Sequence, residues 1–557
     1  MGEVTRRSLL AGAAALGGTA AAVAAPGTAS AGQAAAPPAA PAAPPAAPAA
    51  PAAGRPPGQG LVTVGPEDPR YPSLTRRGTN ARFTGKPARV HVVNTTEQVV
   101  TAVQQAVRDG RRIAVRSGGH CFENFVDDPS VGVLIDTSPM RAIRYDAARR
   151  AFAVEPGALL GEVYRALFLG WGVSIPAGAT AEVGVGGHVL GGGYGTLSRR
   201  YGLSVDHLYA VEVVVVDRSG TARSVVATRD PEDPHHDLWW AHTGGGGGNF
   251  GIVTCYWFRD PAAKGDDPAQ LLPKAPGTVL SSYAVWDWKN LDERAFTRLL
   301  RNHGSWYEHN SAPDSPYAGL FSVLMVNARG SGDILLTGQL DAATPGAERL
   351  MQAYVDAVGR GVGARPVSGH EETPWLQAVA SVQETAPAAF KSKAGYLRNR
   401  FTDEQIGAAY TYLAGGAGGA GKEASAGGAL WLVSYGGQVN AVAPDATAVP
   451  QRDSILKAIY LTSWEAGEAG APRLAWVRDL YRAVYADSGG VPVPGEVSDG
   501  AFVNYPDVDL ADPALNTSGV PWHTLYYKGN YPRLQRVKAR WDPRDEFRHA
   551  LSIRPSR

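Results

Sequence analysis

The amino-acid sequence predicts an α+β fold. Segments with apolar residues at helical spacing, which predict helices, alternate irregularly with short apolar runs, which predict strands. A doubly wound sheet would instead show a regular alternation of strand and helix. Two strands are strongly marked: Val211 to Val216 is apolar apart from Glu212, and Gly251 to Phe258 is largely apolar and aromatic. The hydrophobic content of 44% is typical of a globular protein with a sizeable core.

The folded chain begins near Thr63, and its first clear element is a helix. Thr95 stands three residues before Gln98, a capping-box pattern, and valines then recur at helical spacing until Gly110. Apolar runs predict the elements that follow. These are a buried strand at 113–115, strands at 131–135 and 151–155, and a short helix at 159–168.

The pattern changes near residue 260. Strand-like runs at 319–326 and 429–435 alternate there with helical patterns at 294–302, 346–358 and 473–486. The chain therefore divides, as an interpretation, into a first domain, a substrate domain and a last segment that rejoins the first domain. Their expected bounds are 63–259, 260–499 and 500–557.

The N-terminus has the composition of a processing signal. Arg6-Arg7 precedes an apolar Ala/Leu/Gly run, and Ala29-Ser30-Ala31 offers small residues suited to cleavage. Residues 1–31 therefore resemble a twin-arginine signal peptide, and 32–62 an Ala/Pro-rich linker. The expectation is export by the twin-arginine pathway to the exterior or cell wall of a bacterium. A chance arginine pair in another signal, or an uncleaved anchor, is the alternative.

Charge and cysteine content exclude several classes of partner. Lys plus Arg number 53 and Asp plus Glu 52, so no basic excess exists to attract nucleic acid or an acidic membrane surface. We expect neither partner for the mature chain. Cys121 and Cys255 allow one disulfide at most, which excludes a disulfide scaffold.

Glycine is abundant and clustered in three segments of the first domain. They are 116–120, 176–195 and 244–251. Consecutive glycines expose backbone N–H groups, and such nests bind phosphate. One such segment alone is as often a loop with special backbone angles, whereas three predict a large phosphate-bearing ligand.

The common nucleotide and hydrolase motifs are missing. The G-x-G-x-x-G fingerprint that starts at Gly184 fails at Val189, and there is no P-loop, G-x-S-x-G elbow or H-E-x-x-H helix. His235-His236 beside Asp237 is read as a solvated turn instead of a metal site, because no other ligands have metal-site spacing. We therefore predict no metal.

Five motifs together resemble the berberine-bridge-enzyme-like FAD-linked oxidases, over residues 64–557. They are Arg116–Cys121, Val183–Tyr201, Asp237–Trp240 with its glycine run to Gly251, Asn504–Asp507 and Tyr527–Asn530. The resemblance implies a two-subdomain FAD-binding fold of the vanillyl-alcohol-oxidase type. It also implies a substrate domain with an antiparallel sheet backed by helices.

The resemblance implies that FAD is bonded covalently to His120, which corresponds to the histidine of the family's R-S-G-G-H motif. His188 is the competing candidate, with a hydrogen-bonding role near the flavin as its alternative. The remaining cofactor-binding residues implied are Arg116, Ser117, Gly118, Gly119, Cys121, Thr180, Val183, Gly184, Gly187, His188, Gly193, Tyr194, Gly248, Asn249, Gly251, Ile252, Val253, Tyr527 and Asn530.

The sequence departs from many family members at Thr180. Those members carry a cysteine there, which forms a second bond to the flavin, and threonine has no thiolate to form it. We therefore predict a single 8α-histidyl link.

The resemblance also assigns catalytic roles to two tyrosines. Tyr505 of N-Y-P-D corresponds to the family's proton-accepting base, and Tyr194 to a partner that hydrogen-bonds to it and to the substrate oxygen. Packing against the flavin is the alternative for both. Valine at position 183 is typical of members that react with dioxygen, although it could serve packing alone.

The expected function is that of an FAD-dependent oxidase. Hydride would leave an alcohol or hemiacetal carbon of a small molecule, with a sugar or glycoside favoured, and O2 would reoxidise the flavin to give H2O2. Two alternatives stay open. One is oxidative cyclisation or desaturation of a secondary metabolite on the same flavin, and the other is a secreted binding protein with a vestigial flavin site.

Overall fold

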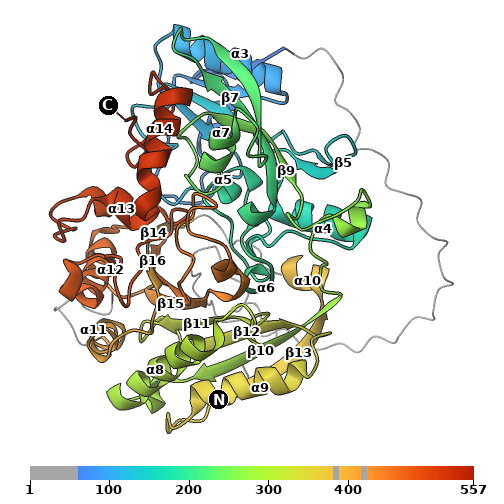
Figure 1. Ribbon diagram of the computed structural model, residues 1–557. Helices are drawn as coiled ribbons and strands as arrows, with labels where there is room; N and C mark the ends of the chain where they lie inside the picture. Colours follow the sequence, from blue (N-terminus) through green and yellow to red (C-terminus); the bar gives the residue numbers. More distant parts are fainter. Residues whose placement is uncertain (1–59, 381–387, 416–422, 557) are drawn as a thin grey trace, which may run out of the picture.

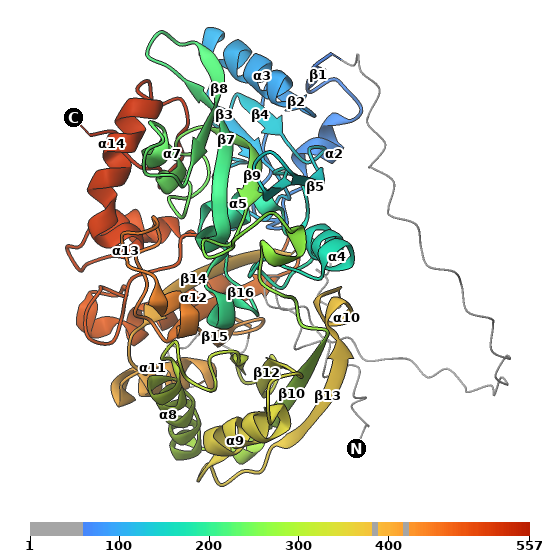
Figure 2. The ribbon, with the colours of Figure 1, turned by 45° about the vertical axis from the view of Figure 1, so that its right-hand side comes forward.

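The computed structural model describes residues 60–380, 388–415 and 423–556. The predicted signal peptide, and the linker up to residue 59, lie outside this part of the chain. No helix in the described ranges is both long enough and apolar enough to cross a membrane. Figures 1 and 2 show the described part as an upper layer with two sheets and a lower layer with one larger sheet.

The first sheet has the strand order β1-β2-β4-β3, with β2 and β3 parallel to β4 and β1 antiparallel to β2. Its strands are β1 (Val62–Val64), β2 (Arg89–Val92), β3 (Ile113–Arg116) and β4 (Val133–Asp136). The second sheet is antiparallel, with the order β5-β6-β9-β7-β8. Its strands are β5 (Ile143–Asp146), β6 (Ala151–Val154), β7 (Leu208–Val216), β8 (Ala222–Thr228) and β9 (Ile252–Phe258).

Helix α3 (Thr96–Arg108) joins these two sheets. Its apolar face shares one buried core with β3 and β4 of the first sheet and with β7 and β9 of the second. The Thr95 side chain accepts from the Gln98 N–H at 3.3 Å, as the capping pattern predicts. The Gln98 side chain, however, accepts from the Asn94 N–H instead of the Thr95 N–H.

Further helices surround the second sheet and connect its strands. They are α4 (Leu160–Trp171), α5 (Val185–Leu190), α6 (Ser198–Tyr201) and α7 (His236–Ala241), with the short α2 (Tyr71–Thr75) beside the first sheet. The chain end adds α13 (Trp522–Tyr527) and α14 (Tyr531–Trp541), and α14 lies against α7 in Figure 1.

The third sheet is antiparallel and has seven strands in the order β13-β10-β12-β11-β15-β16-β14. They are β10 (Thr278–Trp286), β11 (Phe321–Asn327), β12 (Ile334–Asp341), β13 (Val367–Pro374), β14 (Ala389–Leu397), β15 (Ala429–Ser434) and β16 (Leu456–Trp464). Helices α8 (Glu293–Asn310), α9 (Ala347–Gly359), α11 (Asp403–Leu413) and α12 (Ala471–Val484) back one face, and α10 (Trp375–Ala380) follows β13.

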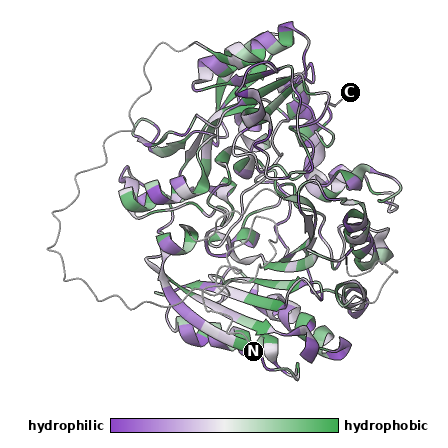
Figure 3. Ribbon diagram, turned by 180° about the vertical axis from the view of Figure 1, so that it is seen from behind, coloured by the Kyte–Doolittle hydropathy of each residue, from purple (hydrophilic) through white to green (hydrophobic). Residues whose placement is uncertain are grey.

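The fold is α+β, as the sequence predicts, and green apolar residues in Figure 3 concentrate in its strands. The opposite face of the third sheet looks toward the first two sheets. Tyr396 on β14 and Lys457 on β16 are paired neighbours on that face. Since their side chains contact residues of the N-terminal and C-terminal segments, the functional site forms where all three regions meet.

Candidate functional site

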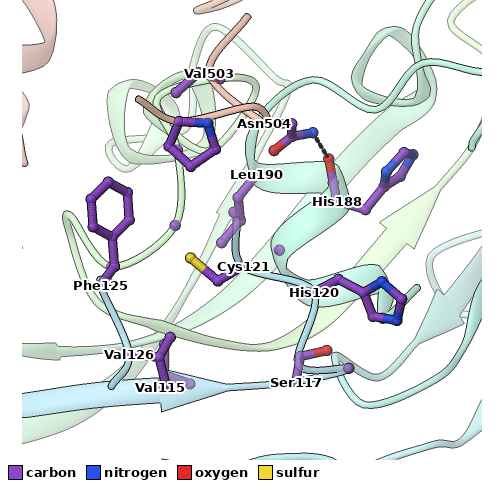
Figure 4. Close-up of a pocket in the computed structure, with 18 of the residues that line it drawn as sticks. Val115, Ser117, His120, Cys121, Phe125, Val126, His188, Leu190, Val503 and Asn504 are labelled. Carbon is purple, nitrogen blue, oxygen red and sulfur yellow. Dashed lines mark hydrogen bonds between the residues drawn. The ribbon is translucent and has the colours of Figure 1, made fainter. Parts of the chain in front are cut away.

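A cavity of about 280 Å³ lies where the three glycine segments converge. Figure 4 shows the rings of His120 and His188 on one side of it, and Cys121 and Phe125 along the wall. Nineteen of the residues predicted from the sequence line this cavity. They are Arg116, Ser117, Gly118, Gly119, His120, Cys121, Thr180, Val183, Gly184, Gly187, His188, Tyr194, Gly248, Asn249, Gly251, Ile252, Val253, Tyr505 and Tyr527.

The first two glycine segments touch each other through their backbones. A Cβ on Gly118 would lie 2.4 Å from the Gly184 backbone nitrogen, and one on Gly184 would lie 2.3 Å from Ser117 Oγ. Gly119 has φ +89°, which L side chains rarely adopt. Only glycine lets the loop after β3 cross the loop before α5 this closely.

The third glycine segment is held by its own Asn249 and by residues of the C-terminal segment. The Asn249 amide donates to the carbonyls of Gly245 and Gly246, and its oxygen accepts from the Ile553 N–H at 2.9 Å. The Tyr527 hydroxyl donates to the Gly245 carbonyl at 2.9 Å. The C-terminal segment thereby fixes the turn between α7 and β9.

Two residues on the cavity wall suit a bound ligand such as FAD. Gly187 on its wall is exposed, and a Cβ there would meet no atom within 4 Å, so this position is open toward the ligand. Thr180 Oγ1 is buried and has no hydrogen-bond partner among the described residues. A buried polar atom without a partner is costly, and a ligand that bonds to it removes that cost.

The two histidines differ in the contacts of their rings. His120 follows β3. Burial lowers the pKa of its imidazole and outweighs a hydrogen bond to the Glu182 backbone, which raises it, so that the pKa is about 4. His188 Nε2 accepts from the Gly178 N–H at 3.0 Å, and burial lowers the pKa of this ring to about 4 as well. Both are therefore neutral near pH 7, and each ring has a partner inside the protein: the Glu182 backbone for His120 and the Gly178 N–H for His188.

Both thiols are held in their protonated form. Burial raises the pKa of Cys121 to about 11, and its Sγ–H donates to the Glu123 carbonyl. Burial also raises the pKa of Cys255 to about 12, and this residue packs in a separate cluster with Ala210 and Trp257. Neither thiol occupies position 180.

Tyr505 and Tyr194 lie beside a buried lysine. The Lys457 ammonium is 3.8 Å from the centre of the Tyr194 ring and 5.9 Å from that of Tyr505. Burial lowers the pKa of Lys457 well below its ordinary value. Burial raises the pKa of Tyr505 to about 12 and raises that of Tyr194 further.

Lys457 is a site residue that sequence reasoning missed. It has no ion-pair or hydrogen-bond partner within the described part of the chain, and its side chain lies among aromatic rings. A lysine within a strand usually marks an exposed position. The signal that could have found it is the apolar run of β16 on both sides of the residue.

Tyr194 departs from its expected hydrogen bond. Its hydroxyl donates to the Ser434 carbonyl at the end of β15, instead of to Tyr505. Tyr505 instead stacks on Phe122, with ring centres 5.2 Å apart and planes 5° apart. The packing of the Tyr194 ring against Tyr435, with centres 5.0 Å apart, explains why its hydroxyl faces β15.

Two predicted cofactor residues, Gly193 and Asn530, lie outside the cavity wall. The Asn530 amide donates to the carbonyls of Pro444 and Thr447, so it holds a loop of the substrate region. Gly193 is needed for packing, because its φ is +68° and a Cβ there would lie 2.3 Å from Ser204 Oγ.

Arg116 lines the cavity, but its charge points elsewhere. Its guanidinium pairs with Asp127 at 2.6 Å and donates to the Leu74 carbonyl. The cation therefore fixes the loop after β3 instead of meeting a phosphate.

The predicted turn at His235-His236 has local partners. The His235 ring contacts the Val226 carbonyl at 2.9 Å, and the His236 ring contacts the Thr228 carbonyl. In the described residues, no cluster of three metal-ligating side chains occurs.

Comparison with known proteins identifies the family. The FAD binding domain model matches residues 87–225, and the model for berberine and berberine-like proteins matches residues 501–554. The chain is 56% identical to the aclacinomycin-N/aclacinomycin-A oxidase of Streptomyces galilaeus over 89% of this chain and 90% of that protein. It is 33% identical to the hexose oxidase of Chondrus crispus over 87% of this chain and 93% of that protein.

Solved structures agree. A glycopeptide hexose oxidase complexed with teicoplanin is 55% identical with a TM-score of 0.84, covering 89% of this chain and 99% of its own. Aclacinomycin oxidoreductase is 55% identical with a TM-score of 0.85, covering 89% of this chain and 100% of its own. The chain is therefore a member of the berberine-bridge-enzyme-like FAD-linked oxidases, with an FAD-binding fold of the vanillyl-alcohol-oxidase type.

Proposed function

We propose that this protein carries FAD on His120 through a single covalent bond and oxidises an alcohol or hemiacetal carbon of a sugar or glycoside. One observation carries the proposal: His120 and the Tyr194–Tyr505 pair line the same glycine-walled cavity. The imidazole that would hold the cofactor and the tyrosine that would accept a proton thus face one space.

When bound, FAD supplies the hydride acceptor that no amino-acid side chain can provide. The backbones of the three glycine segments would hold it, because they leave its faces unobstructed. Thr180 would donate or accept a hydrogen bond through Oγ1. Since Thr180 stands where a second covalent bond would need a thiol, His120 is the single point of attachment.

Tyr505 would take the substrate's hydroxyl proton on its Oη. Burial raises the pKa of Tyr505 to about 12, so the protein must favour its anion by another means. Lys457 lies 5.9 Å from the ring, and burial lowers its pKa, so it would carry a charge only together with the Tyr505 anion; the two groups would then titrate as a coupled pair in which each charge stabilises the other. The Tyr194 ring lies 3.8 Å from the Lys457 ammonium, and its hydroxyl is bonded to the Ser434 carbonyl, so it would have to leave that carbonyl to reach a substrate oxygen.

The relatives support the proposed substrate class. One solved relative holds the glycopeptide teicoplanin, and two relatives are named as hexose oxidases. The acceptor proposed is O2, with H2O2 as product, and Val183 on the cavity wall would leave the flavin accessible to it. A second candidate is oxidative cyclisation or desaturation of a secondary metabolite, because an oxidoreductase solved with pregilvocarcin, which catalyses the terminal step of gilvocarcin biosynthesis, is 41% identical with a TM-score of 0.84.

Export belongs to the same proposal. The twin-arginine pathway carries proteins that are already folded, so FAD would be attached before the protein leaves the cell. The paired arginines Arg6-Arg7 support this route.

The deciding experiment is a screen of the purified protein against free hexoses, glycosides and aglycones, coupled to peroxide detection. The proposal predicts peroxide with a hexose or glycoside and none with the matching aglycone. Turnover of aglycones alone would favour the second candidate. A colourless protein without turnover would contradict both.

A further inference from the structure

A fully buried cluster of charged side chains lies between the attachment loop and the catalytic segment. The attachment loop is defined here as His120–Glu123, and the catalytic segment as Tyr505–Asp509. The cluster joins Glu123 to Lys391 and Lys393 of β14 and to Asp507 and Asp509. None of these five side chains is more than 4% exposed.

Lys391 is the residue that connects the two segments. Its ammonium pairs with Glu123 on one side and with Asp507 on the other, the latter at 2.7 Å. Burial alone would lower the pKa of Lys391, but Asp507, Glu123 and Asp509 together raise it above its ordinary value. The lysine is therefore charged in the folded protein.

The rest of the cluster is attached to the catalytic segment alone. Lys393 pairs with Asp507, and with Asp509 at 3.0 Å. Arg478 of α12 binds both oxygens of Asp509, at 2.8 and 3.0 Å. Three carboxylates thus face three cations, and the charges balance.

The two linked segments also meet through their rings. Phe122, next to Glu123, stacks on Tyr505, two residues before Asp507. Asn504 donates to the His188 carbonyl at 2.9 Å on the other side of Tyr505 (Figure 4). The segment is consequently fixed on both sides of its tyrosine.

Such a cluster is a poor source of stability but a strong constraint on geometry. Desolvation of buried ion pairs largely offsets their attraction, so apolar residues of similar volume often serve stability as well. Buried ion pairs nevertheless restrict the positions of their side chains, because a displaced partner leaves an uncompensated buried charge. A role in alignment therefore explains the cluster better than a role in stability.

We propose that Glu123 and Lys391 are positioning residues that hold the attachment loop against the catalytic segment, so that FAD becomes attached at His120 only after the C-terminal segment has docked. The inference rests on the proposed attachment at His120. That attachment would replace a ring N–H of His120 and a C–H of the flavin 8α-methyl by an N–C bond, and the two protons and two electrons released would convert O2, the acceptor of the proposed function, to H2O2. If this is so, FAD attachment requires strand β14 and the C-terminal segment, although neither of them contains His120.

The test compares two double variants with equal charge. Lys391→Met/Glu123→Gln cuts the link to the attachment loop and leaves Asp507 and Asp509 facing Lys393 and Arg478. Arg478→Met/Asp509→Asn is the matched control, because it removes one ion pair of the same cluster but keeps the Glu123–Lys391–Asp507 link.

Two readouts are taken after FAD is added to protein that was produced in a riboflavin-starved host, where no FAD can have been attached. Retained yellow colour after gel filtration measures FAD that is bound, and a fluorescent band on a denaturing gel measures FAD that is attached. We expect both variants to bind FAD, and the control to attach it at the wild-type rate. The Lys391→Met/Glu123→Gln variant should attach it about 10²-fold more slowly, the effect of a displacement near 1 Å at a reacting group.

Equal attachment rates in the two double variants would overturn the inference and leave the proposed function standing. A wild-type protein without a fluorescent band would overturn both. If Lys391→Met/Glu123→Gln does not fold, the single variant Glu123→Gln takes its place, since Lys391 then keeps Asp507 as its partner. Attachment by that variant at the wild-type rate would also overturn the inference.

Discussion

Burial governs the chemistry of each side chain at the site. It keeps His120 and His188 neutral, keeps both thiols protonated, and raises the pKa of Tyr505 to about 12. A base with so high a pKa is inactive near neutrality unless a cation stabilises its anion. Lys457 is the basic group beside it, and since burial lowers the pKa of this lysine, its ammonium and the Tyr505 anion would form as a coupled pair.

Replacement of Tyr505 by phenylalanine tests the base directly. The variant keeps the ring stacked on Phe122 but removes the proton acceptor, so FAD binding should persist while flavin reduction slows by at least ~10²-fold. Stopped-flow bleaching of the flavin absorbance measures this. A near-normal bleaching rate would exclude Tyr505 as the base.

Replacement of Lys457 by methionine tests the electrostatic role of the lysine. A base works when deprotonated, so the rate rises with pH through the pKa of the coupled Tyr505–Lys457 pair. Loss of the cation raises that pKa, and the rise should move to higher pH, with the largest loss of rate near neutrality. The pH profile of flavin reduction checks this, and an unshifted profile would exclude the role.

Individual site residues could be predicted from the sequence where they belong to a family motif. His120, Tyr194 and Tyr505 were found through the family resemblance, and the structure brings all three to one cavity. Lys457 could not be found that way, because its role depends on rings contributed by distant segments. The partners of Arg116 and Asn530 could not be predicted either, since both side chains donate to carbonyls that are far away in the sequence.

Among the elements, the glycine loops decide the shape of the site. The loop after β3 and the loop before α5 are in backbone contact at Gly118 and Gly184. Their close approach leaves no room for a side chain on either glycine. The cavity wall therefore depends on the absence of two methyl groups.

Replacement of Gly118 by alanine should separate these loops. The added Cβ would lie 2.4 Å from the Gly184 nitrogen, so FAD retention and the unfolding temperature should both fall. Gly170→Ala in α4 is the control, because its Cβ meets no atom within 4 Å. Alanine should stabilise that helix by about 0.5–1 kcal/mol. Equal behaviour of the two variants in thermal unfolding and absorbance would contradict the proposed contact.

The sequence predicted elements best where they are apolar and compact. The helix at 96–108 and the strands of 113–116, 208–216 and 252–258 were all expected within a few residues. Strands β10, β14 and β16 were missed, because β14 carries two lysines and β10 two serines. These polar residues are buried by other parts of the chain, which periodicity in one segment cannot reveal.

In the whole molecule, the last fifty residues close the site from outside the N-terminal region. Lys538 of α14 is fully buried; it pairs with Asp542 at 2.6 Å and donates to the Asn249 carbonyl at 2.8 Å. It thereby ties the C-terminal helix to the third glycine segment. The site is complete only when the two ends of the folded chain have met.

Replacement of Lys538 by methionine should be strongly destabilising. It leaves Asp542 as a buried carboxylate without its cation, a loss of about 3–5 kcal/mol in unfolding free energy. Lys289→Met is the control, since Lys289 is 77% exposed in its pair with Asp287 and exposed ion pairs contribute little to stability. Urea unfolding measures both, and a similar midpoint for the two variants would contradict the role of Lys538.

Composition and motif order predicted the α+β architecture and the family, but not how the three regions join. The ion pairs and hydrogen bonds that join them connect residues hundreds of positions apart, such as Glu123 with Lys391. No periodicity in a single segment encodes such a pairing. The domain bounds proposed from the sequence stay a prediction.

The most direct test of the account is peptide mapping of the purified protein by mass spectrometry after proteolysis under denaturing conditions. The account predicts one flavin adduct per chain, on the peptide that contains His120, and an unmodified Thr180. An adduct on His188 or on either cysteine, or a protein that carries no flavin, would contradict it.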